Sequence, residues 1–381
     1  MPQEEKTTRS RRPVSTAVLL LIIAAAMAGV ALLVVRMMHY SASTTIRSSE
    51  PQQETVTPST SAAAEEPASP QPAEPAQPGG ETPPSEPAPA PEEQPSEEQP
   101  SEEPPAAEPA EKTYTYAAEA DDTRTLDLEL YSAGAILIDA ETNTVICEKN
   151  PDAKIYPASM TKILTALVAC EQIEDLDDTF RMTQAIIDPI FLADATMAGF
   201  VDGEDVPLRE LIYGAILPSG AEATEALAIY VAGSEAAYAE LMNEKAQELG
   251  LTTAHFADAS GLHNEQHYCT IRDMAVILQA ALDNDLCRAV LSTARYTTPP
   301  TNKHPDGVEM INKFLVRAEG QELHGAQILA AKTGYTAQAG NCCASYGVSP
   351  EGRRCICVTA NAWTSWYTVY DHVALYSQYA D

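Results

Sequence analysis

Basic residues are scarce in this chain. Its 381 residues include 23 lysines and arginines against 55 aspartates and glutamates, so the formal net charge is −32. Proteins that bind nucleic acid need clustered lysine and arginine to release counterions from phosphates. The composition therefore argues against nucleic acid as a partner. The acidic excess is uneven: residues 1–47 carry a net charge of +4, residues 48–111 carry −15, and the remainder carries −21.

Charged residues are absent between Val14 and Val35. These 22 positions suffice for a helix across the membrane, since about 20 apolar residues span about 30 Å of hydrocarbon. Four basic residues lie just before this stretch: Lys6, Arg9, Arg11 and Arg12. The positive-inside rule then places residues 1–13 in the cytoplasm and the rest of the chain outside.

A cleaved signal peptide is the alternative interpretation of this apolar stretch. Its apolar region usually spans about 7–15 residues, and Ser41-Ala42-Ser43 is a weak cleavage site. We therefore expect a retained helix over residues 14–35, which makes the chain a single-pass protein of the cell membrane. Both interpretations place the folded part outside the cytoplasm.

Residues 48–111 contain no basic residue and almost no branched apolar residues. This segment holds 15 glutamates and 17 of the 28 prolines. Such a composition cannot bury enough apolar surface to offset the entropy of ordering, and charge repulsion and proline keep the chain extended. We expect residues 36–122 to be a disordered linker and residues 123–381 to form the globular domain.

The eight cysteines all lie in the globular part and have no CxxC…CxxC spacing. Disulfides are possible in an exported chain. Cys343 and Cys357 could face each other if residues 340–348 and 353–361 form a hairpin. Small buried apolar side chains are the alternative, and the sequence does not decide between them.

Alternating and helical patterns divide the globular part into strands at both ends and helices between them. Residues 134–150 predict two strands joined by a polar turn. Helical spacing follows in SMTKILTALVACEQI, LRELIYGAIL, AEATEALAIYVAG, SEAAYAELMNEKAQEL and TIRDMAVILQAAL. Three further strands are predicted in QILAAKTGYT, NCCASYGV and RRCICVTANAW, before a closing helix in WYTVYDHVALYSQYA. This order predicts a mixed α/β fold with one sheet, helices packed on it and a helical subdomain.

Ser159 and Lys162 lie at the start of a predicted helix, in the sequence Ser159-Met160-Thr161-Lys162. A spacing of three places the hydroxyl and the amine on one helix face, where the amine can take the hydroxyl proton. The helix N-terminus also provides free N–H groups for an oxyanion. The alternative is an ordinary N-cap serine followed by a surface lysine.

Two further short motifs carry polar groups. Ser219 directly precedes a predicted helix, although Ser219 and Glu222 also have the spacing of a capping box. Lys332-Thr333-Gly334 lies late on a predicted strand, where an ammonium and a hydroxyl suit a carboxylate and glycine permits a close approach. Alone, this tripeptide is typical of a solvated strand end.

The order of these three motifs resembles the penicillin-recognising serine enzymes, which carry S-x-x-K, S-D-N and K-T-G. Their flanking words are similar to those of the D-alanyl-D-alanine carboxypeptidases among the low-molecular-mass penicillin-binding proteins. These words are PASMTKILTALVA, LPSGAEATEALA, LMNEKAQELGL, FADASGLHNEQHYCTIRDMAVI, AAKTGYTAQAGNCC and RRCICVTANA. The resemblance covers about residues 131–380. It implies a β-lactamase/transpeptidase-like fold, with an antiparallel sheet, helices on both faces and a helical subdomain.

The resemblance also implies a role for each motif. Ser159 would be the nucleophile that attacks the carbonyl between two terminal D-alanines of a peptidoglycan stem peptide. Lys162, kept neutral by burial and by the nearby cation Lys332, would be its general base. Ser219 would relay a proton to the leaving amine. β-Lactam antibiotics would be covalent inhibitors, and no cofactor is needed.

The third motif would bind the substrate. The resemblance implies that Lys332 and Thr333 hold its terminal carboxylate, and that the backbone N–H groups of Ser159 and Tyr335 form the oxyanion hole. Gly334 completes the motif between them.

One position departs from the family pattern. Ala221 stands where the second motif, Ser-x-Asn, usually has asparagine. The missing amide would normally donate to the substrate, and loss of one such donor costs on the order of 10²-fold in rate. This departure leaves open a penicillin- or peptidoglycan-binding protein with weakened turnover. A serine β-lactamase is a second alternative, because it shares the S-x-x-K and K-T-G motifs.

A zinc site is the remaining alternative. His263 and His267 are four residues apart, with Asp273 nearby. The segment reads as a loop and lacks the glutamate of an H-E-x-x-H motif, so we expect no metal. In the resemblance, Ser260-Gly261-Leu262 and His267-Tyr268 are structural or line the cleft.

Overall fold

A computed structural model describes residues 112–126 and 128–380 of the chain. The predicted cytoplasmic stub, the helix over residues 14–35 and most of the linker lie outside the described residues and stay predictions. No helix in the described part is both long and apolar enough to span a membrane. We assigned residues 112–122 to the linker. In the structure, strand β1 (Ala118–Thr125) already begins within this range.

A sheet of six strands organises the described part, in the order β1-β3-β2-β10-β9-β8. The other five strands are β2 (Gly134–Asp139), β3 (Thr144–Lys149), β8 (Gln327–Thr336), β9 (Gly340–Val348) and β10 (Arg354–Ala362). All neighbours pair antiparallel except β1 and β3, which are parallel. The predicted mixed α/β fold with a mostly antiparallel sheet is confirmed, and so are the five strands expected from the sequence.

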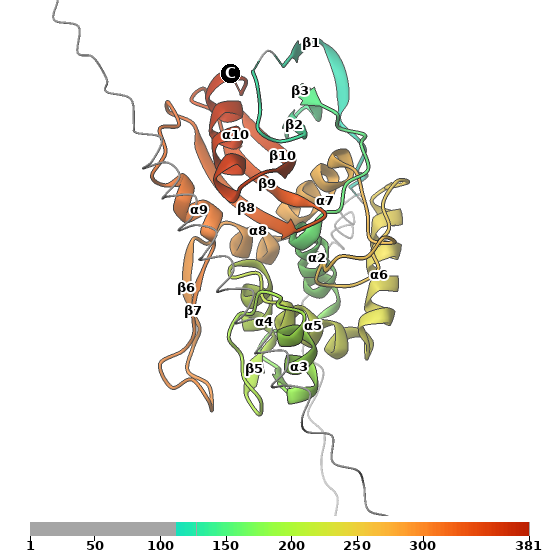
Figure 1. Cartoon of the computed structure of the whole chain (residues 1–381), viewed down its shortest axis with the longest axis vertical. Helices are drawn as coiled ribbons and strands as arrows, with labels where there is room; N and C mark the ends of the chain where they lie inside the picture. Colours follow the sequence, from blue (N-terminus) through green and yellow to red (C-terminus); the bar gives the residue numbers. More distant parts are fainter. Residues whose placement is uncertain (1–111, 127, 381) are drawn as a thin grey trace, which may run out of the picture. The chain divides into compact units, whose positions relative to one another are not determined.

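The helices and the short strands lie between β3 and β8 in the sequence, except for the last helix, which follows β10. The helices are η1 (Ala158–Thr161), α2 (Lys162–Gln172), α3 (Gln184–Leu192), α4 (Leu208–Ile216), α5 (Ala221–Ala232), α6 (Glu235–Glu248), α7 (Ile271–Asp283), α8 (Asp285–Leu291), α9 (Lys313–Ala318) and α10 (Ser365–Gln378). Two hairpins lie apart from the main sheet: β4 (Thr179–Arg181) with β5 (Asp205–Pro207), and β6 (Arg295–Thr297) with β7 (Glu309–Ile311). Figure 1 shows α9 and α10 beside one face of the sheet, with α7 on its other side.

Both faces of the central strands are buried, because successive side chains of a strand point to opposite faces. On β2, Ala135 and Leu137 join the cluster under α10 that contains Leu375. Ile136 and Ile138 join the main core on the other face. This explains why the strands read as nearly continuous apolar runs, with helices on both faces.

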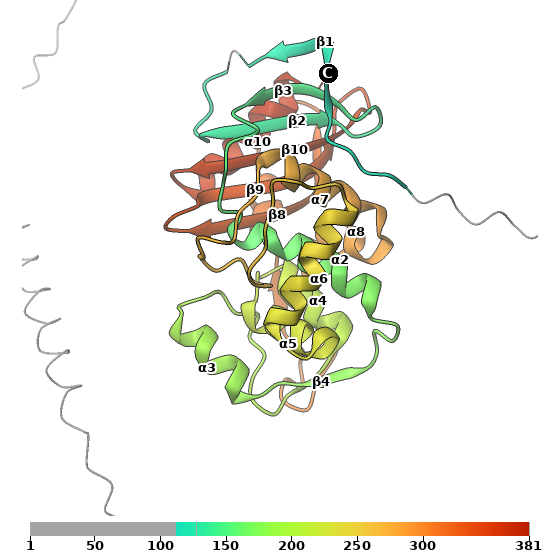
Figure 2. The ribbon, with the colours of Figure 1, turned by 90° about the vertical axis from the view of Figure 1, so that its right-hand side faces the viewer.

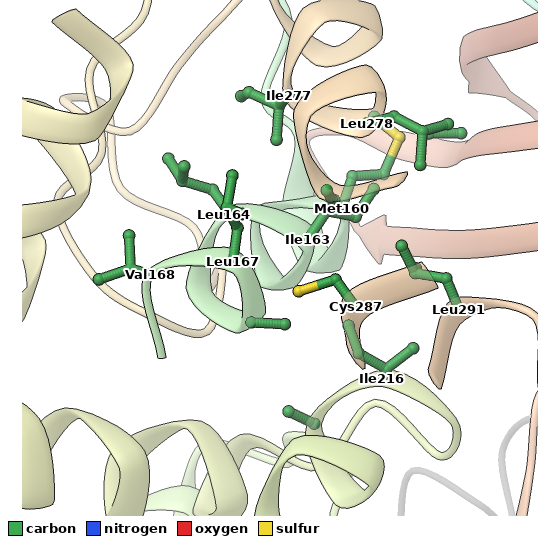
Figure 3. Close-up of a cluster of buried hydrophobic side chains, with 14 of the residues drawn as sticks. Met160, Ile163, Leu164, Leu167, Val168, Ile216, Ile277, Leu278, Cys287 and Leu291 are labelled. Carbon is green, nitrogen blue, oxygen red and sulfur yellow. The ribbon is translucent and has the colours of Figure 1, made fainter. Parts of the chain in front are cut away.

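The helical subdomain lies below the sheet in Figure 2, with α3, α4, α5 and α6 near one another. Helix α2 lies at its centre and contacts α4, α5, α6, α7 and α8. Its first eight residues are all buried, so these residues cannot be displaced without disturbing the core. Figure 3 shows Ile163, Leu164 and Leu167 of α2 packed in this cluster.

The cysteines are all free thiols in the described residues, and seven of the eight are buried. The expected hairpin of residues 340–348 and 353–361 forms as β9 and β10. Its register places Cys343 opposite Thr359 and Cys357 opposite Ser345, so the two cysteines are not cross-strand partners. The expected facing of Cys343 and Cys357 is therefore wrong, because strand register is fixed by packing on both faces.

Candidate active site

The Ser159-x-x-Lys162 motif lies where η1 passes into α2. Lys162 Nζ donates hydrogen bonds to Ser159 Oγ at 3.0 Å and to the carbonyl oxygen of Ser260 at 2.6 Å. Lys162 is 2% exposed, whereas Ser159 is half-buried and lines a pocket. The alternative of a surface lysine is thus excluded by the fold.

Burial sets the protonation of this lysine. It lowers the pKa of Lys162 to about 8, while the carboxylates of Asp258 and Glu222 act in the opposite direction. Burial also lowers the pKa of Lys332 well below its usual range, and the charge of Lys162 adds to this. The expected lowering of the Lys162 pKa is thus found, and burial is its largest cause.

Ser219 and Lys332 form a second serine–lysine pair. Lys332 Nζ donates to Ser219 Oγ at 2.9 Å and to the carbonyl oxygen of Thr333 at 3.0 Å. Lys332 is 2% exposed, which rules out a solvated strand end. Strand β8 and the turn before α5 are thereby joined at the pocket.

Ser219 does not cap α5. The N-cap of that helix is Gly220, without a side-chain hydrogen bond, and Ser219 itself has a φ of 72°. Glu222 accepts hydrogen bonds from the N–H groups of Ala198 and Gly199 at 2.6 and 2.8 Å. The capping-box alternative is therefore wrong, because the carboxylate holds the preceding loop and the hydroxyl is left for Lys332.

Gly334 permits the close packing of β8 against η1. A Cβ at this position would lie 2.6 Å from the carbonyl oxygen of Pro157 and 3.0 Å from the nitrogen of Ser159. The expected close approach at this glycine is made by the backbone of Pro157 and Ser159. Tyr335 follows at the rim and is 65% exposed.

A pocket of about 300 Å³ contains the candidate groups. Its wall includes Ser159, Ser219, Thr333, Gly334 and Tyr335. It is completed by residues that the sequence did not single out: Thr196, Leu217, Pro218, Lys313, Arg317, Asn341, Cys342, Ser365 and Thr368. Lys162 and Lys332 lie behind this wall, each in contact with one of its serines.

A buried polar network supports Lys162 from behind. Thr161 Oγ1 is 2.7 Å from His267 Nε2, and His267 Nδ1 is 3.2 Å from Asp258 Oδ2. Asp258 Oδ1 accepts from the N–H groups of Ser260 and Gly261 at 2.9 and 2.6 Å. This fixes the Ser260 carbonyl that accepts from the lysine.

Sequence reasoning missed Asp258. The signal was present, because an aspartate before Ser-Gly commonly accepts from backbone N–H groups two residues on. The sequence pattern did not show that His267 is the side-chain partner of Asp258, because the two residues are nine positions apart.

The residues of the zinc alternative have separate partners. The ring of His263 meets that of Tyr156 edge-on at 4.7 Å. His267 belongs to the network behind Lys162, and Asp273 forms a capping box with Thr270 at the start of α7. In the part of the chain that the structure describes, no three histidine, cysteine or acidic side chains gather as metal ligands would.

Comparison with known proteins places this site in a class. The fold resembles that of the Streptomyces K15 DD-transpeptidase, with a TM-score of 0.59 and 25% sequence identity over 66% of this chain and 97% of that one. It also resembles penicillin-binding protein 5 from Haemophilus influenzae, with a TM-score of 0.57 and 25% identity over 66% and 70% of the two chains. The class is thus that of the DD-peptidases.

Sequence comparison gives the family. Residues 119–364 match the model of peptidase family S11, D-alanyl-D-alanine carboxypeptidase. The carboxypeptidase DacF of Bacillus subtilis is 30% identical over 236 residues, which cover 59% of this chain and 56% of that protein. DacA of Escherichia coli K12 is 35% identical over 182 residues, 44% of each chain. The chain spans about half the length of these relatives and belongs to the D-alanyl-D-alanine carboxypeptidase family.

Proposed function

We propose that this protein is a serine-type D-Ala-D-Ala carboxypeptidase, which removes the terminal D-alanine from peptidoglycan stem peptides. The observation that carries the proposal is the pairing of two serine hydroxyls with two buried lysines in one pocket. Ser159 is 3.0 Å from Lys162, and Ser219 is 2.9 Å from Lys332. Family membership supplies the substrate class.

Acylation begins with proton transfer from Ser159 to Lys162. With a pKa of about 8, about a tenth of Lys162 is neutral at pH 7 and can accept the hydroxyl proton. The bond between Ser159 Oγ and the carbonyl carbon forms, and the bond to the D-alanine nitrogen then breaks. Ser219 relays the proton to that nitrogen, so D-alanine leaves as a neutral amine and an ester remains on Ser159.

Lys332 binds the terminal carboxylate of the substrate in this proposal, and it must carry a positive charge to do so. Lys332 is buried, and in the described residues its hydrogen bonds go to a hydroxyl and a backbone carbonyl rather than to a carboxylate, so burial lowers its pKa well below the usual range. The terminal carboxylate of a substrate supplies the opposite charge, which favours the ammonium form. Thr333 adds a hydroxyl donor beside it, and this pairing makes binding selective for a free C-terminus.

The oxyanion hole and deacylation complete the cycle. The N–H groups of Ser159 and Tyr335 stabilise the negative oxygen of each tetrahedral intermediate. Lys162 then takes a proton from a water molecule, whose oxygen attacks the ester carbonyl carbon. The bond from that carbon to Ser159 Oγ breaks, the shortened peptide leaves with a free carboxyl group, and Lys162 passes the proton to Ser159. A β-lactam enters by the same acylation step and remains attached, because its leaving group stays tethered to the acyl product.

We place this reaction on the outer side of the cell membrane. The uncharged stretch from Val14 to Val35, with basic residues before it, supports a single-pass anchor. The acidic, proline-rich linker then gives the domain reach toward the cell wall.

The test uses the full-length protein in detergent, a fluorescent penicillin and a pentapeptide ending in D-Ala-D-Ala. We expect stable labelling together with release of free D-alanine. Ser159→Ala should abolish both, with D-alanine release reduced at least about 10³-fold. Ser292→Ala, on an exposed serine at the end of α8, is the matched control and should behave as wild type.

Other outcomes distinguish the alternatives. Rapid hydrolysis of the penicillin with little D-alanine release would indicate a β-lactamase. Labelling without D-alanine release would indicate a binding protein with lost turnover, as the alanine at position 221 allows. Undiminished labelling of Ser159→Ala would overturn the assignment of the nucleophile.

A further inference from the structure

Two cysteines that the proposed reaction does not use lie in direct contact. Cys170 lies near the C-terminal end of α2, and Cys287 lies in α8, 117 positions later in the sequence. The Sγ of Cys287 is 3.2 Å from the Sγ of Cys170. Helices α2 and α8 pack against each other, so both helix backbones support this contact.

The two thiols differ in their surroundings. Cys287 is 1% exposed and joins the cluster of Figure 3, near Ile216 and Leu291. Cys170 is half-buried at the edge of this cluster. The hydrogen bond to Cys170 and burial raise the pKa of Cys287 well above its usual value. Cys170 is thus the thiol that a reagent in solution meets first.

In the described strands, no two of the other cysteines are cross-strand partners. Cys343 faces Thr359 and Cys357 faces Ser345 across the β9–β10 ladder. Cys147 on β3 faces Leu137 of β2, which separates it from β10. Two cysteines on strands that are not neighbours are about 9–10 Å apart, beyond the reach of a disulfide.

We infer that Cys170 and Cys287 are a disulfide-forming pair that ties the end of α2 to α8. The sulfur atoms must approach by only about 1 Å to reach bonding distance. The oxidant is a small-molecule disulfide. The thiolate of Cys170 attacks one of its sulfurs and expels a thiolate, and Cys287 then attacks the sulfur of Cys170 and expels the second. Two protein thiols become one disulfide, and the two protons pass to the two released thiolates.

The bridge would stabilise the helix that begins at the candidate active site. It closes a loop of more than a hundred residues, which removes much entropy from the unfolded chain. Helix α2 carries Lys162 at its first position and Cys170 two turns later on the same rigid element. The inference does not depend on the peptidase reaction, since it concerns stability rather than chemistry at Ser159.

The experiment incubates the reduced full-length protein with glutathione disulfide and counts thiols by alkylation and mass spectrometry. We expect six alkylated cysteines, the loss of two hydrogen atoms, and a single cross-linked peptide pair that contains Cys170 and Cys287. The midpoint of thermal unfolding should rise by about 5–15 °C on oxidation and return on reduction. The rate of penicillin labelling should change by less than about twofold.

Variants separate this pair from the other cysteines. Cys170→Ser should abolish the shift in midpoint and leave seven reactive thiols. Cys355→Ser, the control on β10 beneath α10, should retain the oxidation-dependent shift. The inference is overturned if wild type keeps eight reactive thiols, if another pair is cross-linked, or if a stable glutathione adduct accumulates on Cys170. If the cross-link forms but penicillin labels neither the reduced nor the oxidised protein, the proposed function fails and this inference stands.

Discussion

The side chain of Lys332 donates a hydrogen bond to Ser219 across 113 positions of sequence, with 2.9 Å between Nζ and Oγ. Ser219 adopts a φ of 72°, in the left-handed region that non-glycine residues seldom occupy. Such a conformation is retained where the surroundings over-determine it, often at functional sites. Here the loop held by Glu222 and the strand that carries Lys332 fix it from two sides. The strain thus aims a hydroxyl into the pocket beside Ser159.

The protonation of Lys162 predicts the pH dependence of acylation. Only the neutral amine can take the proton of Ser159, and the pKa of Lys162 is lowered to about 8. Between pH 6 and 7 the rate of penicillin labelling should rise about tenfold per pH unit, and it should level off above about pH 8.5. Stopped-flow labelling from pH 6 to pH 9.5 measures this. A rate that is flat over this range would exclude Lys162 as the base.

The packing of Gly334 predicts that a single methyl group inactivates the enzyme. In Gly334→Ala the new Cβ meets the backbone of Pro157 and Ser159, so β8 and η1 must separate. We expect labelling at least 10²-fold slower and a loss of about 1–3 kcal/mol in the free energy of unfolding. Gly320→Ala is the control, because its nearest atom is 3.9 Å away. Equal activity of the two variants would contradict the structure.

The network behind Lys162 predicts a stability effect with a defined pH window. Burial acts to raise the pKa of Asp258, but the hydrogen bond and charge of His267 and the N–H donors outweigh it, so the pKa is lowered. The ionised carboxylate therefore stabilises the fold above about pH 3.8, and this contribution is lost as the pH falls through the lower folded value. Urea unfolding should show Asp258→Asn less stable than wild type at pH 7 by about 1–3 kcal/mol.

Urea unfolding of wild type and Asp258→Asn at low pH tests whether the effect comes from the charge of Asp258. Between pH 4 and pH 3 the difference in the free energy of unfolding between wild type and Asp258→Asn should become smaller. A difference that stays constant over this interval would show that the asparagine acts through packing rather than through charge. Labelling should also slow at pH 7, because the Ser260 carbonyl loses its support.

Ala221 predicts a gain of function. It is buried in the first turn of α5, where the family pattern has asparagine. An amide at this position adds a donor for the peptide carbonyl of the substrate, so Ala221→Asn should accelerate D-alanine release by about 10- to 100-fold. Steady-state assays with the pentapeptide measure the rate of D-alanine release. The midpoint of thermal unfolding shows whether the larger side chain destabilises the fold. Slower release with an unchanged midpoint would show that the pocket is adapted to alanine.

Much of this arrangement could be predicted from the sequence. The helical spacing of Ser159 and Lys162 placed both on one turn, because helix geometry depends only on local positions. The strands β8, β9 and β10 were recognised from short apolar runs. The start of β1 was not, since Ala118–Thr125 carries acidic residues and gains its order by pairing with β3.

The partners of polar side chains were harder to predict, because they depend on which loops meet. The spacing of Ser219 and Glu222 was equally suited to a capping box. Only the fold decided that Glu222 holds Ala198 while Ser219 faces Lys332. The contact of Cys170 with Cys287 was likewise invisible, since it joins two helices far apart in the chain.

The sequence by itself determined the three motifs, their order and the membership of the family, because these are properties of residue identity and spacing. It also determined the distribution of charge, with a net charge of +4 over residues 1–47, −15 over residues 48–111 and −21 over the remainder. Tertiary structure alone decided the protonation of Lys162 and Lys332, the strand register around Cys343 and the contact between the thiols. Each of these depends on burial and on distance between remote segments, and only the folded chain fixes those quantities.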